Sequence, residues 1–367
     1  MPDLFDGVLA RGGVREAVAD AAWLQAMLDA EVALARARGL SGEPLAAIEA
    51  ACRPEHFDPA ALGREAAAGG NPVVPLAAAL RERAGDEAHR GATSQDILDT
   101  AAMLVARRAL EPLTADLAGA AQAAWLLARE HRATAMAART LLQQAVPTTF
   151  GRQAAGWAAA LDGAVARLRA LRLPAQLGGP GGTLEGLGRD VPERFAAELG
   201  LLAPALPWHT DRTPIAELAA ALGIACGTVA KAARDVVLLA QTEVAEVREG
   251  APGGSSSMPH KRNPVAAVSA LGCAREAPAY VASVLASMEQ EHQRAAGAWH
   301  AEWRPFTVLL VATGSAAAWL RTCLENLEVD PRRMRANLDV PGDDRAGVAA
   351  AAALVDRALA ARSQPPS

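Results

Sequence analysis

Lysine is almost missing from this chain of 367 residues. Of its 36 basic residues only Lys231 and Lys261 are lysine, and the other 34 are arginine. An ammonium group is a compact point charge and a guanidinium is a planar fork, so the two cations are not interchangeable. A lysine at position 261, inside a polar loop of so arginine-rich a chain, therefore indicates a specific task for its charge.

Other features that the sequence lacks exclude several classes of protein. Basic residues do not dominate, since the net charge is −5, and no basic face suggests nucleic-acid binding. The four cysteines (Cys52, Cys226, Cys273 and Cys323) fit no metal-ligand spacing, which is typical of buried thiols in a reducing compartment. The N-terminus lacks the basic start and apolar run of a signal peptide, and no stretch of eighteen uncharged apolar residues predicts a membrane span. We expect a cytoplasmic protein with no nucleic-acid or membrane partner and no metal.

The alternation of apolar and polar residues that predicts β-strands is nearly absent too. From Pro214 to Glu249 apolar residues recur at helical spacing, with Thr213 suited to the N-cap and Gly250 ending the run. Such a helix would have 36 residues and a length of about 54 Å. Similar segments are expected at 97–132, 149–171, 265–289 and 305–328. Five long helices in a chain that is 51% hydrophobic predict an all-α bundle.

Shifts in composition predict three regions along the chain. They are an N-terminal helical domain at 1–100, a central long-helix bundle at 101–330 and a short C-terminal helical remnant at 331–367. The remnant is expected to hold one alanine-rich helix near 347–361, and the glycine-rich segment 177–191 is expected to loop out from the bundle. The wide alanine-rich surface of such long helices favours association with a partner.

The most informative segment is the polar loop GGSSSMPHKRNP at 253–264. Its two glycines allow backbone conformations that turn consecutive N–H groups toward an anion, and Lys261 and Asn263 can hold carboxylate oxygens. This loop resembles the signature loop of the fumarase/aspartase superfamily, whose enzymes form or break a bond β to a carboxylate. Two further stretches resemble the other motif regions of the superfamily: HRGATSQD at 89–96 and RTLLQQAVPTTFG at 139–151.

Three more stretches are most similar to the bacterial 3-carboxy-cis,cis-muconate cycloisomerase family. They are QLGG at 176–179, WHTDRTP at 208–214 and EHQRAAGAWHAEW at 291–303. The resemblance runs from about Trp23 to Asp339. It implies an isomerase that converts the small tricarboxylate 3-carboxy-cis,cis-muconate to 4-carboxymuconolactone, in the protocatechuate branch of the β-ketoadipate pathway of aromatic catabolism. No cofactor is implied.

The resemblance also implies an assembly. In the superfamily the central bundles of four subunits form a twenty-helix core, and each active site draws its three motif regions from three different chains. We therefore expect a homotetramer with shared sites. Relatives often carry a third, C-terminal helical domain, but only about thirty residues follow Asn337 here, so we expect that domain to be truncated or absent.

The resemblance assigns catalysis to the loop. Ser255 aligns with the catalytic serine of the superfamily and is expected to carry the proton, because its alkoxide would be stabilised by N–H groups of the glycine turn and by Lys261. Lys261 and Asn263 would bind the carboxylate whose α-carbon is deprotonated. Ser256 is expected to donate a hydrogen bond rather than act as the base.

A second set of residues is expected to bind the remaining carboxylates of the substrate. Thr93 and Ser94 offer hydroxyls, although capping of the following helix would also explain them and both roles can coexist. The further candidates are His89, Thr140, Gln143, Arg212 and Arg294. Trp299 and Trp303 lie four residues apart on one helical face and are expected to pack rather than to touch substrate.

Leu141 departs from the pattern of the superfamily. Many of its lyases have a histidine here that helps to protonate an amine or alcohol leaving group, which leucine cannot do. Lactone opening expels a carboxylate, whose conjugate acid has a pKa of about 4, so no proton is needed at neutral pH. Leucine therefore favours a cycloisomerase over an adenylosuccinate-type lyase, for which His89 or His300 would have to replace the donor. A non-catalytic scaffold on the same fold should have lost Ser255 or Lys261.

Overall fold

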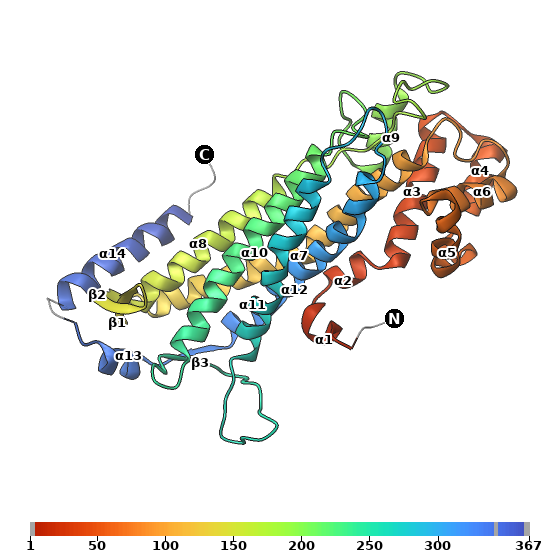
Figure 1. Cartoon of the computed structure of the whole chain (residues 1–367). Helices are drawn as coiled ribbons and strands as arrows, with labels where there is room; N and C mark the ends of the chain where they lie inside the picture. The colour runs from red at the N-terminus through yellow and green to blue at the C-terminus, as the bar shows by residue number, and fades with distance from the viewer. Residues whose placement is uncertain (1–3, 341–343, 363–367) are drawn as a thin grey trace.

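The computed structural model describes residues 4–340 and 344–362 and is an elongated helical bundle (Figure 1). Five long helices run along its length, and most of the shorter helices of the N-terminal part of the chain gather at one end. The long helices are α7 (Ser94–Glu130), α8 (Phe150–Arg169), α10 (Thr213–Leu239), α11 (Val265–Ala286) and α12 (Ala298–Glu325). The prediction of an all-α bundle is confirmed.

Shorter elements flank the bundle. The elements that precede it are α1 (Asp6–Leu9), α2 (Val14–Ala17), α3 (Asp20–Ala37), α4 (Gly42–Ala51), the 3-10 helix η1 (Pro54–His56), α5 (Pro59–Gly69) and α6 (Val73–Ala84). The later helices are α9 (Val191–Leu199), between α8 and α10, and α13 (Pro331–Asn337) and α14 (Asp344–Arg362), after α12. The strands form two antiparallel pairs, β1 (Ala135–Thr140) with β2 (Gln143–Thr149) and β3 (Val247–Glu249) with β4 (Leu327–Val329).

Helix α7 sets the length of the bundle. Its 37 residues follow the N-cap Thr93 without a break, which corresponds to about 55 Å at 1.5 Å per residue. Ala106, Ala109 and Ala120 are fully buried along it, and such small side chains let neighbouring helices approach closely. The predicted domain boundaries at residues 100 and 330 stay predictions, and α7 crosses the first of them.

Four of the five predicted long helices begin and end within a few residues of their expected bounds. The exception among these ends is the start of α12. Helix α12 begins at Ala298 rather than at Pro305. Pro305 lies inside the helix, where its missing N–H removes one backbone hydrogen bond. The buried residues Trp299 and Glu302 extend the helix before it, so tertiary packing overrides the local signal of the proline.

The helix predicted at 214–249 is wrong in its last ten residues. Helix α10 ends at Leu239, and the Glu246 N–H donates back to the Leu239 carbonyl at 2.9 Å. Ala245 adopts a left-handed backbone with φ 51°. The following strand β3 pairs with β4. The apolar spacing continues through this reversal, which is why the end of the helix cannot be read from the pattern.

The β1–β2 hairpin was not predicted, and it carries the second motif region. Thr140 pairs with Gln143, so Leu141 and Leu142 alone form the turn. Both leucines have positive φ, 50° and 66°, as a two-residue type I′ turn requires. Asparagine and glycine are the usual residues in such a turn, so the residue types here do not indicate one.

Helices α13 and α14 fold back onto this hairpin. Helix α14 packs against β2 and α8, and Arg132 forms a bidentate ion pair with Asp356 of α14. Gly347 lies so close to Pro147 that an added Cβ would be 2.8 Å from the Pro147 carbonyl oxygen. The helix predicted near 347–361 is confirmed. The expected truncation of a C-terminal domain stays a prediction.

Helices α10 and α12 are long and apolar enough to cross a membrane, with mean hydropathies of 1.5 and 1.4 over eighteen residues. In the structure 56% and 67% of the residues in these windows are buried inside the bundle. Buried core helices of soluble proteins pass the same test of length and composition, so the two helices are weak evidence of a membrane span.

Gly151 and Gly163, both on α8, offer a matched test of how closely the helices pack. A Cβ at Gly151 would lie 2.6 Å from the Ala128 carbonyl oxygen and 2.7 Å from that of His131, whereas a Cβ at Gly163 would meet nothing within 4 Å. Gly151→Ala should lower the free energy of unfolding by about 1–3 kcal/mol. Gly163→Ala should raise it by up to about 1 kcal/mol through helix propensity. Thermal unfolding measures both, and equal shifts in Tm would contradict the close approach at Gly151.

Candidate active site

The first motif region lies at the N-terminal end of α7. Thr93 is the N-cap, and its backbone N–H donates to Asp96 Oδ2 at 2.9 Å within a capping box. The side chains of Thr93 and Ser94 are partly exposed. The capping role considered for Thr93 is therefore present, while substrate binding by Thr93 and Ser94 stays a prediction.

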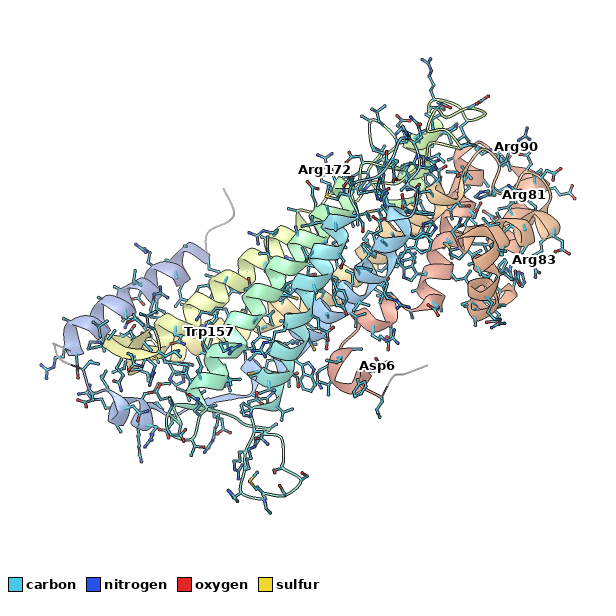
Figure 2. The ribbon with its side chains drawn as sticks, viewed as in Figure 1. Asp6, Arg81, Arg83, Arg90, Trp157 and Arg172 are labelled. Atoms are coloured by element: carbon cyan, nitrogen blue, oxygen red, sulfur yellow. The ribbon has the colours of Figure 1, made fainter. Side chains whose placement is uncertain are left out.

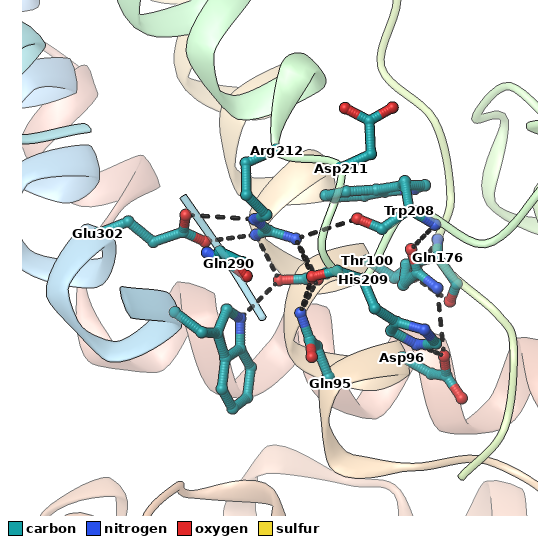
Figure 3. Close-up of polar contacts among 12 residues, drawn as sticks. Gln95, Asp96, Thr100, Gln176, Trp208, His209, Asp211, Arg212, Gln290 and Glu302 are labelled. Carbon is teal, nitrogen blue, oxygen red and sulfur yellow. Dashed lines mark hydrogen bonds and ion pairs between the residues drawn. The ribbon is translucent and has the colours of Figure 1, made fainter. Parts of the chain in front are cut away.

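Asp96, which is fully buried, ties this end of α7 to the glycine-rich segment. Its carboxylate accepts the N–H groups of Gly178 and Gly179, both at 2.9 Å, and lies 2.6 Å from His209 Nε2 (Figure 3). A buried carboxylate needs such donors to offset the loss of solvation. The expectation that 177–191 loops out as a whole is corrected, because its first residues are buried beside Asp96.

Arg212 is buried at the same end between two carboxylates (Figure 3). Its Nη1 and Nη2 donate to Asp99 at 2.8 and 3.0 Å, and its Nε and Nη2 donate to Glu302. Trp299 Nε1 also donates to Asp99, at 2.9 Å. The predicted binding of a substrate carboxylate by Arg212 is corrected, because its donors are all occupied and only 1% of its surface is exposed. Arg212, rather than the predicted Thr213, is also the cap residue of α10.

The charges of this cluster do not balance. One buried guanidinium faces two carboxylates. By contrast, Arg81 and Arg90 are exposed at the end of the molecule where α4, α5 and α6 gather (Figure 2). Burial, with a smaller contribution from the charge of Asp99, raises the pKa of Glu302 to about 7, against the attraction of Arg212. Burial opposes the charge of Arg212, but Asp99 and Glu302 together raise its pKa above the ordinary value. The two carboxylates therefore compete for one cation.

His89 and Arg294 lie at the same end. His89 is buried, with Nδ1 2.6 Å from Glu31 Oε1. Arg294 Nη2 donates to the Gly179 carbonyl at 2.7 Å, and burial lowers the pKa of Arg294. Gly179 is held in turn by Asp96. The structure thus brings Arg294 close to the first motif region, to which His89 belongs, and carboxylate binding by either residue stays a prediction.

The second motif region lies beyond the opposite end of α7. The strand β1 begins a few residues after α7 ends, and Thr140 and Gln143 are exposed at the tip of the hairpin. The turn residues are exposed too, Leu141 by 97% and Leu142 by 69%. Because α7 is about 55 Å long, one chain does not bring Thr93 and Thr140 together.

The third motif region, the loop 253–264, projects from the bundle between β3 and α11 (Figure 1). Gly253 and Asn263 close its base with two backbone hydrogen bonds, at 2.9 and 3.1 Å. Asn263 Nδ2 donates to the Gly254 carbonyl at 3.1 Å. Asn263 therefore shapes the loop and keeps its amide oxygen and one amide hydrogen for other partners.

Ser255 Oγ accepts the backbone N–H of Met258 at 3.1 Å and, more weakly, that of Ser257 at 3.4 Å. The prediction placed these donors in the glycine turn, and the structure places them after the serine. Two N–H dipoles directed at one oxygen stabilise negative charge there. Ser256 and Lys261 are exposed, so the loop of a single chain faces solvent.

A family model described as Lyase matches residues 70–277. The 3-carboxy-cis,cis-muconate cycloisomerase of Bradyrhizobium diazoefficiens is 49% identical over 356 residues, which cover 92% of this chain and 79% of that protein. The nitrosuccinate lyase of Streptomyces davaonensis is 46% identical over 366 residues, covering 92% of this chain and 77% of that protein. The chain belongs to the fumarase/aspartase superfamily of lyases.

The fold of this superfamily member agrees with a solved structure. The crystal structure of the 3-carboxy-cis,cis-muconate lactonizing enzyme of Pseudomonas putida superposes with a TM-score of 0.87 at 37% identity. The match covers 99% of this chain and 89% of that chain. The resemblance inferred from the motifs is therefore confirmed along nearly the whole described bundle.

The buried acids that fix the motif regions of this lyase were not predicted. Asp96, Asp99 and Glu302 lie within or just after the motif stretches, and their burial is not apparent from residue type. Glu246 is fully buried and accepts hydrogen bonds from Arg139 Nη1 at 3.0 Å and Nη2 at 2.7 Å. Arg139 directly precedes Thr140 in the second motif region. The available signal was an acidic residue inside an otherwise apolar helical stripe, which rarely stays buried without a partner.

Glu302→Gln should make the free energy of unfolding less dependent on pH than it is in the wild type. A carboxyl whose pKa is raised from 4.5 to about 7 binds more protons folded than unfolded, so its contribution to stability falls as pH rises through this window. The fall is on the order of 3 kcal/mol. The Tm of Glu302→Gln relative to wild type should therefore rise between pH 5 and pH 8, with Glu325→Gln on the exposed end of α12 as the control for net charge. A constant difference would show that Arg212 keeps Glu302 ionised throughout.

Proposed function

We propose that this chain is a 3-carboxy-cis,cis-muconate cycloisomerase, which forms 4-carboxymuconolactone in the protocatechuate branch of the β-ketoadipate pathway. The observation that carries the proposal is Leu141, an apolar residue at the tip of the hairpin of the second motif region. The similarity to named cycloisomerases at 49% and 44% identity supports it. The buried, free cysteines fit a cytoplasmic enzyme.

The reaction adds an oxygen to one carbon of an alkene and a proton to the other. In the lactonising direction a carboxylate oxygen of the substrate attacks the β-carbon, and Ser255 delivers a proton to the α-carbon. The negative charge that develops on the activating carboxylate is held by Lys261 and Asn263. In the reverse direction Ser255 removes that proton, and the N–H groups of Ser257 and Met258 support its alkoxide.

Carboxylate binding falls to the other two motif regions in this proposal. Thr93, Ser94 and Arg294 hold one end of the tricarboxylate, with His89 beside them, and Thr140 and Gln143 supply donors from the hairpin. Arg212 acts behind them by fixing the helices, without touching substrate. No step needs a metal or a cofactor.

Elimination of nitrite from nitrosuccinate is the second candidate. Nitrite, like a carboxylate, is the weakly basic anion of an acid that is ionised at neutral pH, so it leaves without a proton donor. Leu141 is therefore compatible with it, and the 46% identity to a nitrosuccinate lyase favours it specifically. Adenylosuccinate-type chemistry expels an amine and is disfavoured, because Leu141 offers no proton.

A homotetramer with active sites shared between chains is part of the proposal. The length of α7 separates Thr93 from Thr140 and from the loop of Ser255 within one chain. The exposed Leu141 and Leu142, in a strained turn, are the kind of surface that a neighbouring subunit covers.

A substrate panel tests the proposed activity. The purified protein should abolish the ultraviolet absorbance of 3-carboxy-cis,cis-muconate, since lactonisation removes the conjugation, and should release no fumarate from adenylosuccinate or argininosuccinate. Leu141→His should not speed lactonisation and is expected to slow it, because a polar ring replaces an apolar wall. Release of nitrite from nitrosuccinate without lactonisation would select the second candidate, and robust release of fumarate would refute both.

Mixed tetramers test the sharing of sites. Ser255→Ala should lose about 10²- to 10⁴-fold of kcat, and Thr140→Val should also be inactive, each with helical circular dichroism unchanged. After joint unfolding and refolding at equal amounts, about a quarter of the sites should carry neither lesion, because each site draws the two residues from different chains. Recovery near a quarter of wild-type activity is expected. No recovery in properly reassembled hybrids would contradict shared sites.

A further inference from the structure

His89 rests on a buried carboxylate that comes from a distant part of the chain. Glu31 lies on α3, and its Oε1 is 2.6 Å from His89 Nδ1. The exposed fractions are 2% for Glu31 and 7% for His89. An acid is seldom so deeply buried without a partner, and here the histidine is that partner.

The Glu31 carboxylate is otherwise poorly satisfied. Its Oε2 is enclosed and has no hydrogen-bond partner among the described residues. A buried acceptor left in this state costs about 1–3 kcal/mol. The neighbouring positions of α3, Ala30, Ala33 and Leu34, are apolar and buried, so an apolar residue at position 31 would suit the core better. Packing and stability therefore do not account for Glu31.

The backbone of His89 is also strained where this contact is made. Its φ is 56°, in the left-handed region that non-glycine residues seldom adopt, and such strain costs about 1–3 kcal/mol. The same loop is anchored independently, because Arg38 donates to the carbonyl and to the carboxylate of Glu87. The contact between Glu31 and His89 is thus not needed merely to attach the loop to α3.

The contact leaves one ring nitrogen of His89 for other use. Nδ1 faces Glu31, while Nε2 has no hydrogen-bond partner among residues 4–340 and 344–362 and is not among the enclosed polar atoms. A carboxylate that accepts from Nδ1 fixes the proton on that nitrogen and sets the orientation of the ring. Nε2 is then the nitrogen left for another partner, on a residue that precedes the N-cap Thr93 of α7 by four positions.

We propose that Glu31 is a positioning residue that keeps a proton on Nδ1 of His89 and orients the ring so that Nε2–H of the imidazolium donates to a carboxylate of the substrate at the N-terminus of α7. The proposal rests on the proposed function for the identity of that carboxylate. Glu31 itself touches no substrate. When His89 is protonated, Nε2–H donates to the carboxylate, and Glu31 balances the charge of the ring.

Nitrogen NMR tests the dyad without any substrate. Protein labelled with ¹⁵N-histidine is recorded at pH 9, and His89 is assigned by its loss in His89→Gln. A protonated Nδ1 in wild type, lost or mixed with the Nε2–H form in Glu31→Leu and kept in Glu31→Gln, is the expected result. An unprotonated Nδ1 with a protonated Nε2 in wild type would overturn the proposal, whatever the enzyme's substrate is.

Kinetics test the function of the dyad on whichever substrate the wild type turns over. Glu31→Leu should lower kcat/KM by about 10- to 100-fold, chiefly through KM, because a carboxylate contact made in ground and transition state alike is lost. Glu31→Gln keeps an acceptor for Nδ1–H but lacks the charge that balances the imidazolium, so its kcat/KM should lie between those of the wild type and Glu31→Leu. In a His89→Gln background, Glu31→Leu should have little further effect.

Glu87→Gln is the matched control, since it weakens the other anchor of the same loop without touching His89. It should leave KM close to wild type. If Glu87→Gln raised KM as much as Glu31→Leu, or if Glu31→Leu acted in full on top of His89→Gln, Glu31 would have only a structural role and the proposal would fail. Failure of the wild type on 3-carboxy-cis,cis-muconate alone would instead count against the proposed function.

Discussion

The unbroken helix α7 is the constraint on which the rest of the structure depends. It carries Thr93 at its N-cap and leads into the hairpin of Thr140, so about 55 Å of rigid helix separates two motif regions that one reaction must use. A loop could fold back over that distance, but a helix packed on both sides by α8 and α12 cannot. The proposed homotetramer would bring such motif regions together from different chains, and the alanine-rich helix faces are what it would bury.

Buried acidic residues hold the neighbouring segments in place at each end of that helix. Asp96 and Asp99 lie on its first turns, where they fix the glycine-rich segment and Arg212. Glu246 does the same for Arg139 at the far end. Each pair is costly to desolvate, and replacing such pairs by apolar residues is often neutral or stabilising. Their common effect is geometric, since each one orders a segment next to residues that are expected to meet substrate.

The long helices and the loop 253–264 could be predicted because their signals are local. Helical periodicity is visible in any window of the sequence, and the loop has its own composition. The end of α10 and the turn at Leu141 and Leu142 could not be predicted, since both depend on partners far along the chain. Arg212 was misread for the same reason: its sequence neighbours do not reveal that Asp99 and Glu302 already fill its donors. Residue type suggests what a side chain can bind, and only the fold decides what it does bind.

Leu141 combines an unfavourable local conformation with an exposed apolar side chain. A leucine with positive φ and an almost fully exposed side chain is unfavourable twice over in a lone chain, through backbone strain and through apolar surface in water. Both costs fall if the tip enters an apolar wall of a site completed by another subunit. In that place leucine excludes water and supplies no proton, which suits a leaving group that is already a stable anion. In the proposed enzyme the same residue thus favours one class of reaction by its chemistry, and its exposure favours a partner chain that covers it.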